Sequence, residues 1–323
     1  MIGRHMLEEL QSQPAVWRRV LSEVLPEYAG LLPAPGERVQ VLGCGSSWFM
    51  AQAYAAAREQ EGLGETDAFT PTEAPRSRSY DRVVLISRSG TTSEAVDVLR
   101  SLPEGVPTVA VVGDPDSHLA RRVAHAVPLP FADERSVVQT RFATAALFLL
   151  LGSLGADRLG LDRAVADTRD LLEELDPDAG IAGGPAGKPL DEQLLTAEQF
   201  TFLGSGWCLG PAHEAALKMR ESCQAWTESY PSMEYRHGPI AIAGPDRVTW
   251  QFGAAPAGLA EQVRGTGARF ENCDRHPLAE LVRVHAAALI RAGRHGLDPD
   301  HPRSLSRSVI LDDQTPEGTN GTV

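Results

Sequence analysis

Lysine is almost absent from this chain of 323 residues, because Lys188 and Lys218 are its only two and nearly all other positive charge comes from arginine. Few side chains are therefore available for chemistry that uses a lysine amine. Acidic residues outnumber basic ones by 43 to 30, which gives a formal net charge of −13. A charge of this sign excludes binding of nucleic acid or anionic membranes through overall charge, but it is compatible with a local cationic pocket.

Cysteine and long apolar runs are also scarce. The four cysteines include no close-spaced pair and no Cys/His pattern typical of a metal site, so we expect reduced thiols and no metal. The most apolar stretch, residues 145–155, is too short to span a membrane and predicts a core helix. The N-terminus lacks the pattern of a signal peptide. We therefore expect a cytoplasmic protein with no membrane partner.

Short apolar runs alternate with helical patterns in both halves of the chain. This alternation is typical of α/β proteins and predicts two tandem, doubly wound parallel sheets of the flavodoxin-like kind. The expected strands are 39–43, 82–87, 108–114 and 126–130 in the first half, and 200–206, 247–252 and 308–313 in the second. The expected helices are 48–60, 92–102, 117–124, 211–226 and 276–289.

We divide the chain into a helical N-terminal segment (1–30), a first α/β domain (31–179), a second (190–313) and a flexible tail (314–323). A Gly- and Pro-rich linker, 180–189, lies between the two domains. The halves are similar in order: "VLGCGSS" pairs with "FLGSGWC", "DRVVLISRSG" with "DRVTWQFGAA", and "DSHLARRV" with "DRHPLAELV". This similarity indicates duplication of one α/β unit.

The two copies differ after their second strands. The first continues with Ser87, Arg88, Ser89, Gly90 and two threonines, whereas the second, from Phe252 to Pro256, has no hydroxyl. Ligands of doubly wound sheets lie at the carboxyl ends of strands, where helix N-termini attract anions. Ser and Thr are also common as helix N-caps without any ligand. Because the fold of the second copy does not need the hydroxyls, the loop predicts a phosphate site.

A second loop in the equivalent position, "GCGSSW" (43–48), brings Ser46 and Ser47 toward the same anion. The chain has no "GxxxxGK[ST]" motif, and "GCGSSW" lacks the third glycine of a dinucleotide fingerprint. A small phosphorylated metabolite therefore fits better than a nucleotide.

A second group of reactive residues lies between 213 and 241. Glu214, Lys218 and Glu221 share one helix face at positions i, i+4 and i+7, and as a bare pattern this predicts a solvated stripe of ion pairs. His237 follows in the loop "YRHGP", where a histidine is more often structural than functional. Spacing alone does not decide the function of this segment.

The ordered set of motifs resembles the SIS (sugar isomerase) family, in particular the isomerase half of glucosamine-6-phosphate synthase and its free-standing deaminase-like relatives. The motifs run through nearly the whole chain: "MLEELQSQP", "CGSSW", "ISRSGTT", "TRFAT", "EAALKMRESCQAWTESYPSMEYRHGP" and "PRSLSRSV". The resemblance implies two tandem SIS domains and a homodimer with a shared active site. It also implies a phosphorylated amino sugar as ligand, with no cofactor.

The resemblance assigns roles to individual residues. Glu221 matches the carboxylate that moves a proton between C1 and C2 of the open sugar, and Lys218 matches a lysine beside it. His237 matches the histidine that opens the ring and comes from the partner subunit. The expected phosphate ligands are Ser47, Ser87, Arg88, Ser89 and Thr92, with Arg88 in place of a common glutamine. Further sugar contacts are expected from Gly45, Ser46 and Gln139.

Arg307 stands where the family has a lysine that forms a Schiff base, and arginine cannot replace that chemistry. The resemblance also begins near Met6, without a glutaminase domain, so we expect no glutamine-driven amination. The leading hypothesis is conversion of glucosamine 6-phosphate to fructose 6-phosphate and ammonia. Alternatives are dehydration of N-acetylglucosamine 6-phosphate, aldose–ketose isomerisation without nitrogen chemistry, and a non-catalytic sugar-phosphate sensor.

Overall fold

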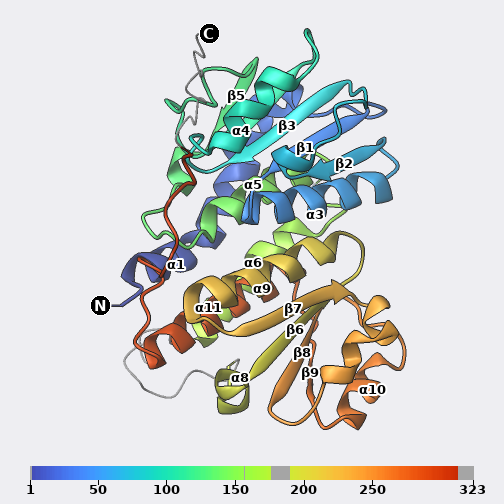
Figure 1. Cartoon of the computed structure of the whole chain (residues 1–323), viewed down its shortest axis with the longest axis vertical. Helices are drawn as coiled ribbons and strands as arrows, with labels where there is room; N and C mark the ends of the chain where they lie inside the picture. The colour runs from blue at the N-terminus through green and yellow to red at the C-terminus, as the bar shows by residue number, and fades with distance from the viewer. Residues whose placement is uncertain (1, 156, 176–189, 312–323) are drawn as a thin grey trace, which may run out of the picture.

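The computed structural model describes residues 2–155, 157–175 and 190–311, which form two α/β halves stacked along the long axis of the molecule (Figure 1). The upper half contains one sheet in the order β2-β1-β3-β4-β5, and the lower half contains a second in the order β7-β6-β8-β9. All the strand pairs are parallel. The predicted fold class is therefore confirmed, and the first sheet has the flavodoxin-like strand order.

The strands form where the sequence is continuously apolar, because both faces of a parallel sheet are covered by helices. Three predicted strands have the observed bounds: β1 (Val39–Gly43), β3 (Arg82–Ser87) and β8 (Arg247–Phe252). The sequence analysis missed the short or polar strands β2 (Thr66–Phe69), β7 (Trp226–Pro231) and β9 (Arg269–Glu271). The remaining strands are β4 (Thr108–Val112), β5 (His125–Pro128) and β6 (Gln199–Gly204).

Helices fill the space between the two sheets. Helix α3 (Ser46–Gln60) covers β1 and packs directly on α9 (Leu209–Cys223), which covers β6 and β7. Helices α1 (Arg4–Arg19), α5 (Arg141–Gly152), α6 (Leu161–Glu174) and α11 (Pro277–Arg294) complete this layer. The contact between α3 and α9 places the start of the first half's helix beside reactive side chains of the second half.

Shorter helices cover the outer faces. Helix α4 (Ser93–Asp97) and the 3₁₀ turn Val98–Ser101 pack on the first sheet, and α10 (Leu259–Gly265) packs on the second. Helices α2 (Leu25–Tyr28) and α8 (Glu192–Thr196) are single turns. Within the described ranges, no helix is long and apolar enough to cross a membrane.

Two predicted elements are wrong. Residues 117–124 form turns rather than a helix, because the Leu119 N–H donates to the Gly90 carbonyl (2.9 Å) instead of to its own preceding turn. Residues 308–311 form no strand. Their backbone bonds to Ser93, the first residue of α4, and not to a strand at the edge of a sheet. Residues 312–313, the predicted linker 180–189 and the predicted tail 314–323 lie outside the described residues.

Candidate functional site

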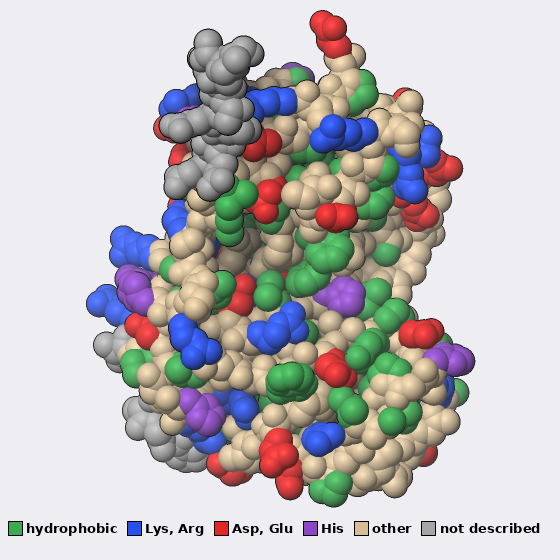
Figure 2. All heavy atoms as spheres, in the orientation of Figure 1, with side chains coloured by type: hydrophobic (Ala, Val, Ile, Leu, Met, Phe, Trp, Pro, Cys, Tyr) green, Lys and Arg blue, Asp and Glu red, His purple; other side chains and the backbone are tan. Residues whose placement is uncertain are grey.

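A cavity of about 210 Å³ opens at the carboxyl ends of β1 and β3. These neighbouring strands flank the point where the chain reverses direction across the sheet, since β2 lies on one side and β4 and β5 on the other. The cavity walls come from loops 44–47 and 86–95, from Val137 and Gln139, from Lys218 and Glu221 on α9, and from residues 305–309. Figure 2 shows the hollow between the two halves of the molecule.

The loop after β1 delivers the beginning of α3 to this cavity. Gly45 has φ 56° and ψ −124°, a conformation that suits glycine, and α3 begins at the next residue. Ser46 and Ser47 are buried and line the cavity. The Ser47 and Trp48 N–H groups donate to the carbonyls of Cys44 (3.1 Å) and Gly45 (3.0 Å). The helix dipole and the two serine hydroxyls, rather than free N–H groups, therefore favour an anion at this position.

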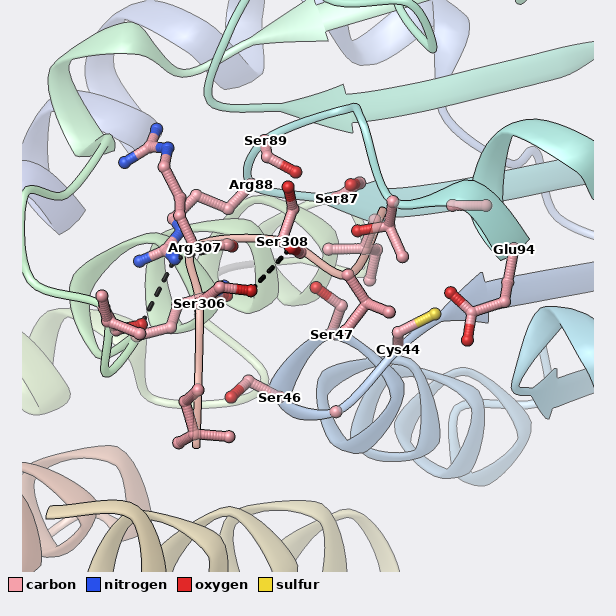
Figure 3. A pocket seen from close by; sticks show the side chains of 18 of the residues that line it. Cys44, Ser46, Ser47, Ser87, Arg88, Ser89, Glu94, Ser306, Arg307 and Ser308 are labelled. Carbon is pink, nitrogen blue, oxygen red and sulfur yellow. Dashed lines mark hydrogen bonds between the residues drawn. The ribbon is translucent and has the colours of Figure 1, made fainter. Parts of the chain in front are cut away.

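The loop after β3 is held by its own hydroxyls. The Ser87 Oγ accepts from the Gly90 N–H at 3.1 Å, and the Ser89 Oγ accepts from the Thr91 N–H at 3.2 Å. These bonds use the oxygen atoms as acceptors, so the hydroxyl protons remain as donors. In Figure 3, Ser47, Ser87 and Ser89 lie around one space at the ends of β1 and β3. The loops thus bring together the serines predicted to bind phosphate, and Thr92 also lines the cavity.

Arg88 lines the cavity, but its guanidinium is largely engaged by protein groups. It donates to the carbonyls of Ser136 (2.9 Å), Val137 (3.3 Å) and Arg307 (3.1 Å). The buried Glu134 carboxylate lies 3.9 Å away. Arg88 therefore joins three segments that form the cavity wall, while its buried Nε has no hydrogen-bond partner in the described part of the chain.

The spacing of Glu214, Lys218 and Glu221 predicted a solvent-exposed stripe of ion pairs on α9, and this prediction is wrong. Glu214 and Lys218 are buried, with the Lys218 side chain only 1% exposed, and only the Glu221 side chain is partly exposed, at 19%. The Lys218 ammonium contacts the Glu221 carboxylate and lies 3.5 Å from Glu214. The stripe faces inward because α9 packs between α3, α11 and its own sheet.

Burial sets the electrostatics of this group. It raises the pKa of Glu214 to about 7, although the Lys218 charge opposes the shift. Burial alone lowers the pKa of Lys218, but the two glutamates outweigh it and raise the pKa. His285 on α11 is fully buried, and burial together with Lys218 lowers its pKa to about 3. Lys218 is therefore a charged ammonium with a neutral histidine nearby.

The chain's C-terminal segment crosses the cavity mouth. The Thr91 and Ser308 hydroxyls are 3.0 Å apart, and the Ser93 N–H donates to the Val309 carbonyl at 3.1 Å. Arg307 belongs to the cavity wall, but its guanidinium binds the Asp133 carboxylate and the Glu134 carbonyl. The residue that replaces the expected lysine is thus occupied by an ion pair.

His237 is the one predicted catalytic residue that this chain does not bring to the cavity. It is exposed at the end of the 3₁₀ turn Glu234–His237 and is absent from the cavity lining. Gln139 and Gly45 do line the cavity, and the Gln139 Oε1 is buried without a partner in the described residues. The sequence analysis did not single out Cys44 and Glu94 as lining residues, although Cys44 lies within its motif "GCGSSW" and Glu94 follows "ISRSGTT" by two residues.

All four cysteines are free thiols, and burial raises the pKa of Cys44 to about 12. Cys44 is therefore a protonated thiol near neutral pH rather than a nucleophile. Among the residues that the structure describes, no group of three His, Cys, Asp or Glu side chains is placed to hold a metal ion.

The paired parallel sheets and the cavity at the switch point define the fold of the SIS-type phosphosugar isomerases. More particularly, the chain is homologous to the isomerase part of glutamine–fructose-6-phosphate aminotransferase. It is 30% identical to that enzyme from Thermus thermophilus and 25% identical to that from Methanothermobacter thermautotrophicus, in each case over 95% of this chain. It spans 57–59% of the length of these relatives. A scan against family models gives no match.

Solved structures show the same fold over nearly the whole chain. A glucosamine-6-phosphate deaminase from Thermotoga maritima superimposes with a TM-score of 0.78 at 21% identity, covering 95% of this chain and all of that one. A tagatose-6-phosphate ketose/aldose isomerase from Escherichia coli gives a TM-score of 0.72 at 16% identity, covering 96% of each chain.

Proposed function

We propose that this protein is a hexosamine-6-phosphate isomerase/deaminase that converts glucosamine 6-phosphate to fructose 6-phosphate and ammonia. The observation on which this depends is the position of Glu221 and Lys218 in the same cavity as the hydroxyl-rich loops that follow β1 and β3. One end of the cavity suits a phosphate, and the other presents a carboxylate held by a buried ammonium. An open-chain sugar phosphate has matching groups at its two ends.

The proposed steps follow from the groups present. His237 opens the sugar ring by moving the ring proton. The resulting C1 aldehyde acidifies the C2 proton, which Glu221 removes and returns at C1. The product carries an imine at C2, and water hydrolyses it to the ketone and ammonia. No lysine is needed to form a Schiff base, which agrees with the engagement of Arg307 by Asp133.

We further propose that His237 acts in the cavity of a second copy of this chain. His237 is exposed and is absent from the lining residues of its own cavity. Met233, which directly precedes the turn that holds His237, is 55% exposed, and this favours coverage by another protein surface. A homodimer with shared active sites accounts for both features.

The proposed reaction is tested by incubating the protein with glucosamine 6-phosphate and separately with N-acetylglucosamine 6-phosphate, followed by mass spectrometry. Ammonia and a hexose phosphate from the first sugar support the proposal. Loss of one water from the second indicates the alternative dehydratase, and binding of either sugar without turnover indicates a sensor.

The role of Glu221 is tested by Glu221→Gln, which retains size but cannot accept the C2 proton. We expect loss of turnover, by about 10²-fold or more, with little change in sugar-phosphate affinity. Ser89→Ala is the matched variant at the other end of the cavity, and it should weaken affinity more than turnover. Full activity of Glu221→Gln would show that the base is another residue.

Shared sites are tested by mixing Glu221→Gln with His237→Ala, each inactive alone. Reassorted dimers contain one intact site, so activity should recover to about a quarter of that of the unmodified protein. No recovery after verified subunit exchange would contradict a shared site.

A further inference from the structure

A second groove adjoins the cavity beyond Glu221. It has a volume of about 250 Å³ and shares Glu221 and Leu305 with the cavity wall. Its other lining residues are Arg220 and Gln224 at the end of α9, and Arg303 and Ser304 in the C-terminal segment. A ligand whose phosphate lies at the start of α3 and whose reacting carbons lie at Glu221 would therefore have this groove next to its reacting end.

Neither of the groove's two guanidinium groups forms an ion pair with a carboxylate of the described residues. Within these residues, Arg220 donates only to the hydroxyl (2.9 Å) and carbonyl (3.4 Å) of Thr227. Arg303 makes no hydrogen bond or ion pair with any residue that the structure describes. The groove's one carboxylate, Glu221, is already paired with Lys218. In a chain with a net charge of −13, this is a locally cationic surface.

Helix electrostatics explain only part of this arrangement. A basic residue in the last turn of α9 complements the helix dipole, which is a sufficient reason for Arg220. Arg303 belongs to a segment beyond α11 and ends no helix. The dipole therefore gives no reason for the second guanidinium beside the first.

The backbone of the groove is also unusual. The described residues include only three non-glycine residues with positive φ, and two of them, Gln224 (54°) and Ser304 (63°), line this groove. Gln224 is the left-handed C-cap of α9, which is a common way for a helix to end. Ser304 ends no helix, and residues other than glycine rarely adopt its conformation. The end of α9 and the segment that holds Arg303 both line the groove.

We propose that the groove is an anion subsite for a carboxylate carried on the nitrogen of the sugar phosphate. This inference rests on the proposed function and specifies its substrate class: a 2-amino sugar 6-phosphate whose nitrogen bears a short acidic alkyl group. The chemistry balances as before. The proton moves from C2 to C1, water breaks the C2–N imine and supplies the ketone oxygen, and the amine leaves with its acidic group instead of as ammonia.

Unreactive probes separate binding from turnover. 2-Amino-2-deoxyglucitol 6-phosphate has no aldehyde, and it is compared with its N-carboxymethyl and N-(2-hydroxyethyl) derivatives by calorimetry. We expect the N-carboxymethyl probe to bind about tenfold more tightly than the neutral one, as for a charge-assisted hydrogen bond. Arg303→Gln should remove this preference without changing the affinity of the neutral probe. Arg122→Gln, an exposed arginine in a turn of the first half, is the control and should change neither.

Equal binding of the two derivatives, or a preference that survives Arg303→Gln, would overturn the subsite. Added acetate tests whether the carboxylate must be attached to the sugar nitrogen. If acetate tightens binding of the unsubstituted probe and this effect requires Arg303, the groove binds a free carboxylate and the proposed N-substituted substrate is wrong. Turnover of glucosamine 6-phosphate without any carboxylate preference would leave the proposed function standing and remove the subsite. Conversely, if the N-carboxymethyl probe binds more tightly through Arg303 but glucosamine 6-phosphate is not turned over, the subsite stands and the proposed function is wrong.

Discussion

Arg307 and Asp133 form an ion pair in which one guanidinium nitrogen lies 2.6 and 2.7 Å from the two carboxylate oxygens. The pair joins the C-terminal segment to the loop that precedes α5. On the other side of the same segment, the Arg307 carbonyl accepts from Arg88. Residue 307 is thus fixed through both its side chain and its backbone, and we interpret its arginine as a positioning residue for the cavity wall.

Breaking this pair should weaken substrate binding without stopping the chemistry. The side chains are 42% and 33% exposed, so solvent screening limits the pair to about 1 kcal/mol or less. Arg307→Gln and Asp133→Asn should each raise KM by up to about fivefold, and the double variant should do no more than either alone. If Arg307→Gln lowers kcat and Asp133→Asn does not, then Arg307 acts directly on the substrate.

Glu214 should make stability depend on pH. Its pKa rises from 4.5 in the unfolded chain to about 7 in the fold, so the folded state holds a proton that the unfolded state releases. The resulting stability is fully present below pH 4.5 and is lost as pH rises through about 7. Over this range the contribution is on the order of 2–3 kcal/mol.

Urea unfolding from pH 4.5 to 8 tests this expectation. Glu214→Gln keeps the shape but does not titrate, so its free energy of unfolding should fall less with rising pH than that of the unmodified protein. Glu192→Gln, at an exposed position, is the control. Parallel pH profiles for all three proteins would contradict the assignment to Glu214.

Gly90 should be intolerant of a side chain for two separate reasons. Its φ is 60°, and an added Cβ would lie 2.1 Å from the Ser117 Oγ. Gly105 has φ 84° but open space around its Cβ position, so Gly105→Ala isolates the backbone cost of about 1 kcal/mol. We expect Gly90→Ala to cost clearly more in urea unfolding and to weaken phosphate binding. Similar losses in the two variants would show that the Ser117 contact relaxes easily.

The sequence predicted the fold well because buried parallel strands are continuous apolar runs. β3 follows this rule, and so does β1 apart from Gln40. β8 ("RVTWQF") alternates apolar and polar residues, which is also a strand signal, whereas β7 is the polar sequence "WTESYP" and gives no such signal. Local patterns also predicted the serine loops. They did not predict the burial of Lys218, because a charged helix face is usually solvated and only the packing of α9 on α3 and α11 buries it.

The contacts between distant parts of the sequence that form the site could not be predicted from local patterns either. No local pattern indicates that Arg88 donates to a carbonyl 219 residues away, or that residues 305–309 close one side of the cavity. The resemblance supplied the positions of Glu221, His237 and Arg307, but it did not reveal that Asp133 engages Arg307. That pairing required the folded chain.

The packing of α3 against α9 has a consequence for stoichiometry. The two helices follow equivalent strands of the duplicated unit, yet Glu214, Lys218 and Glu221 on α9 correspond to Ala53, Ala57 and Gln60 on α3. The loop after β8 likewise lacks the serines that follow β3. Under the proposed function, the first copy supplies the anion-binding loops and the second supplies the acid–base groups. Each chain should accordingly bind one sugar phosphate, although its architecture contains the framework of two.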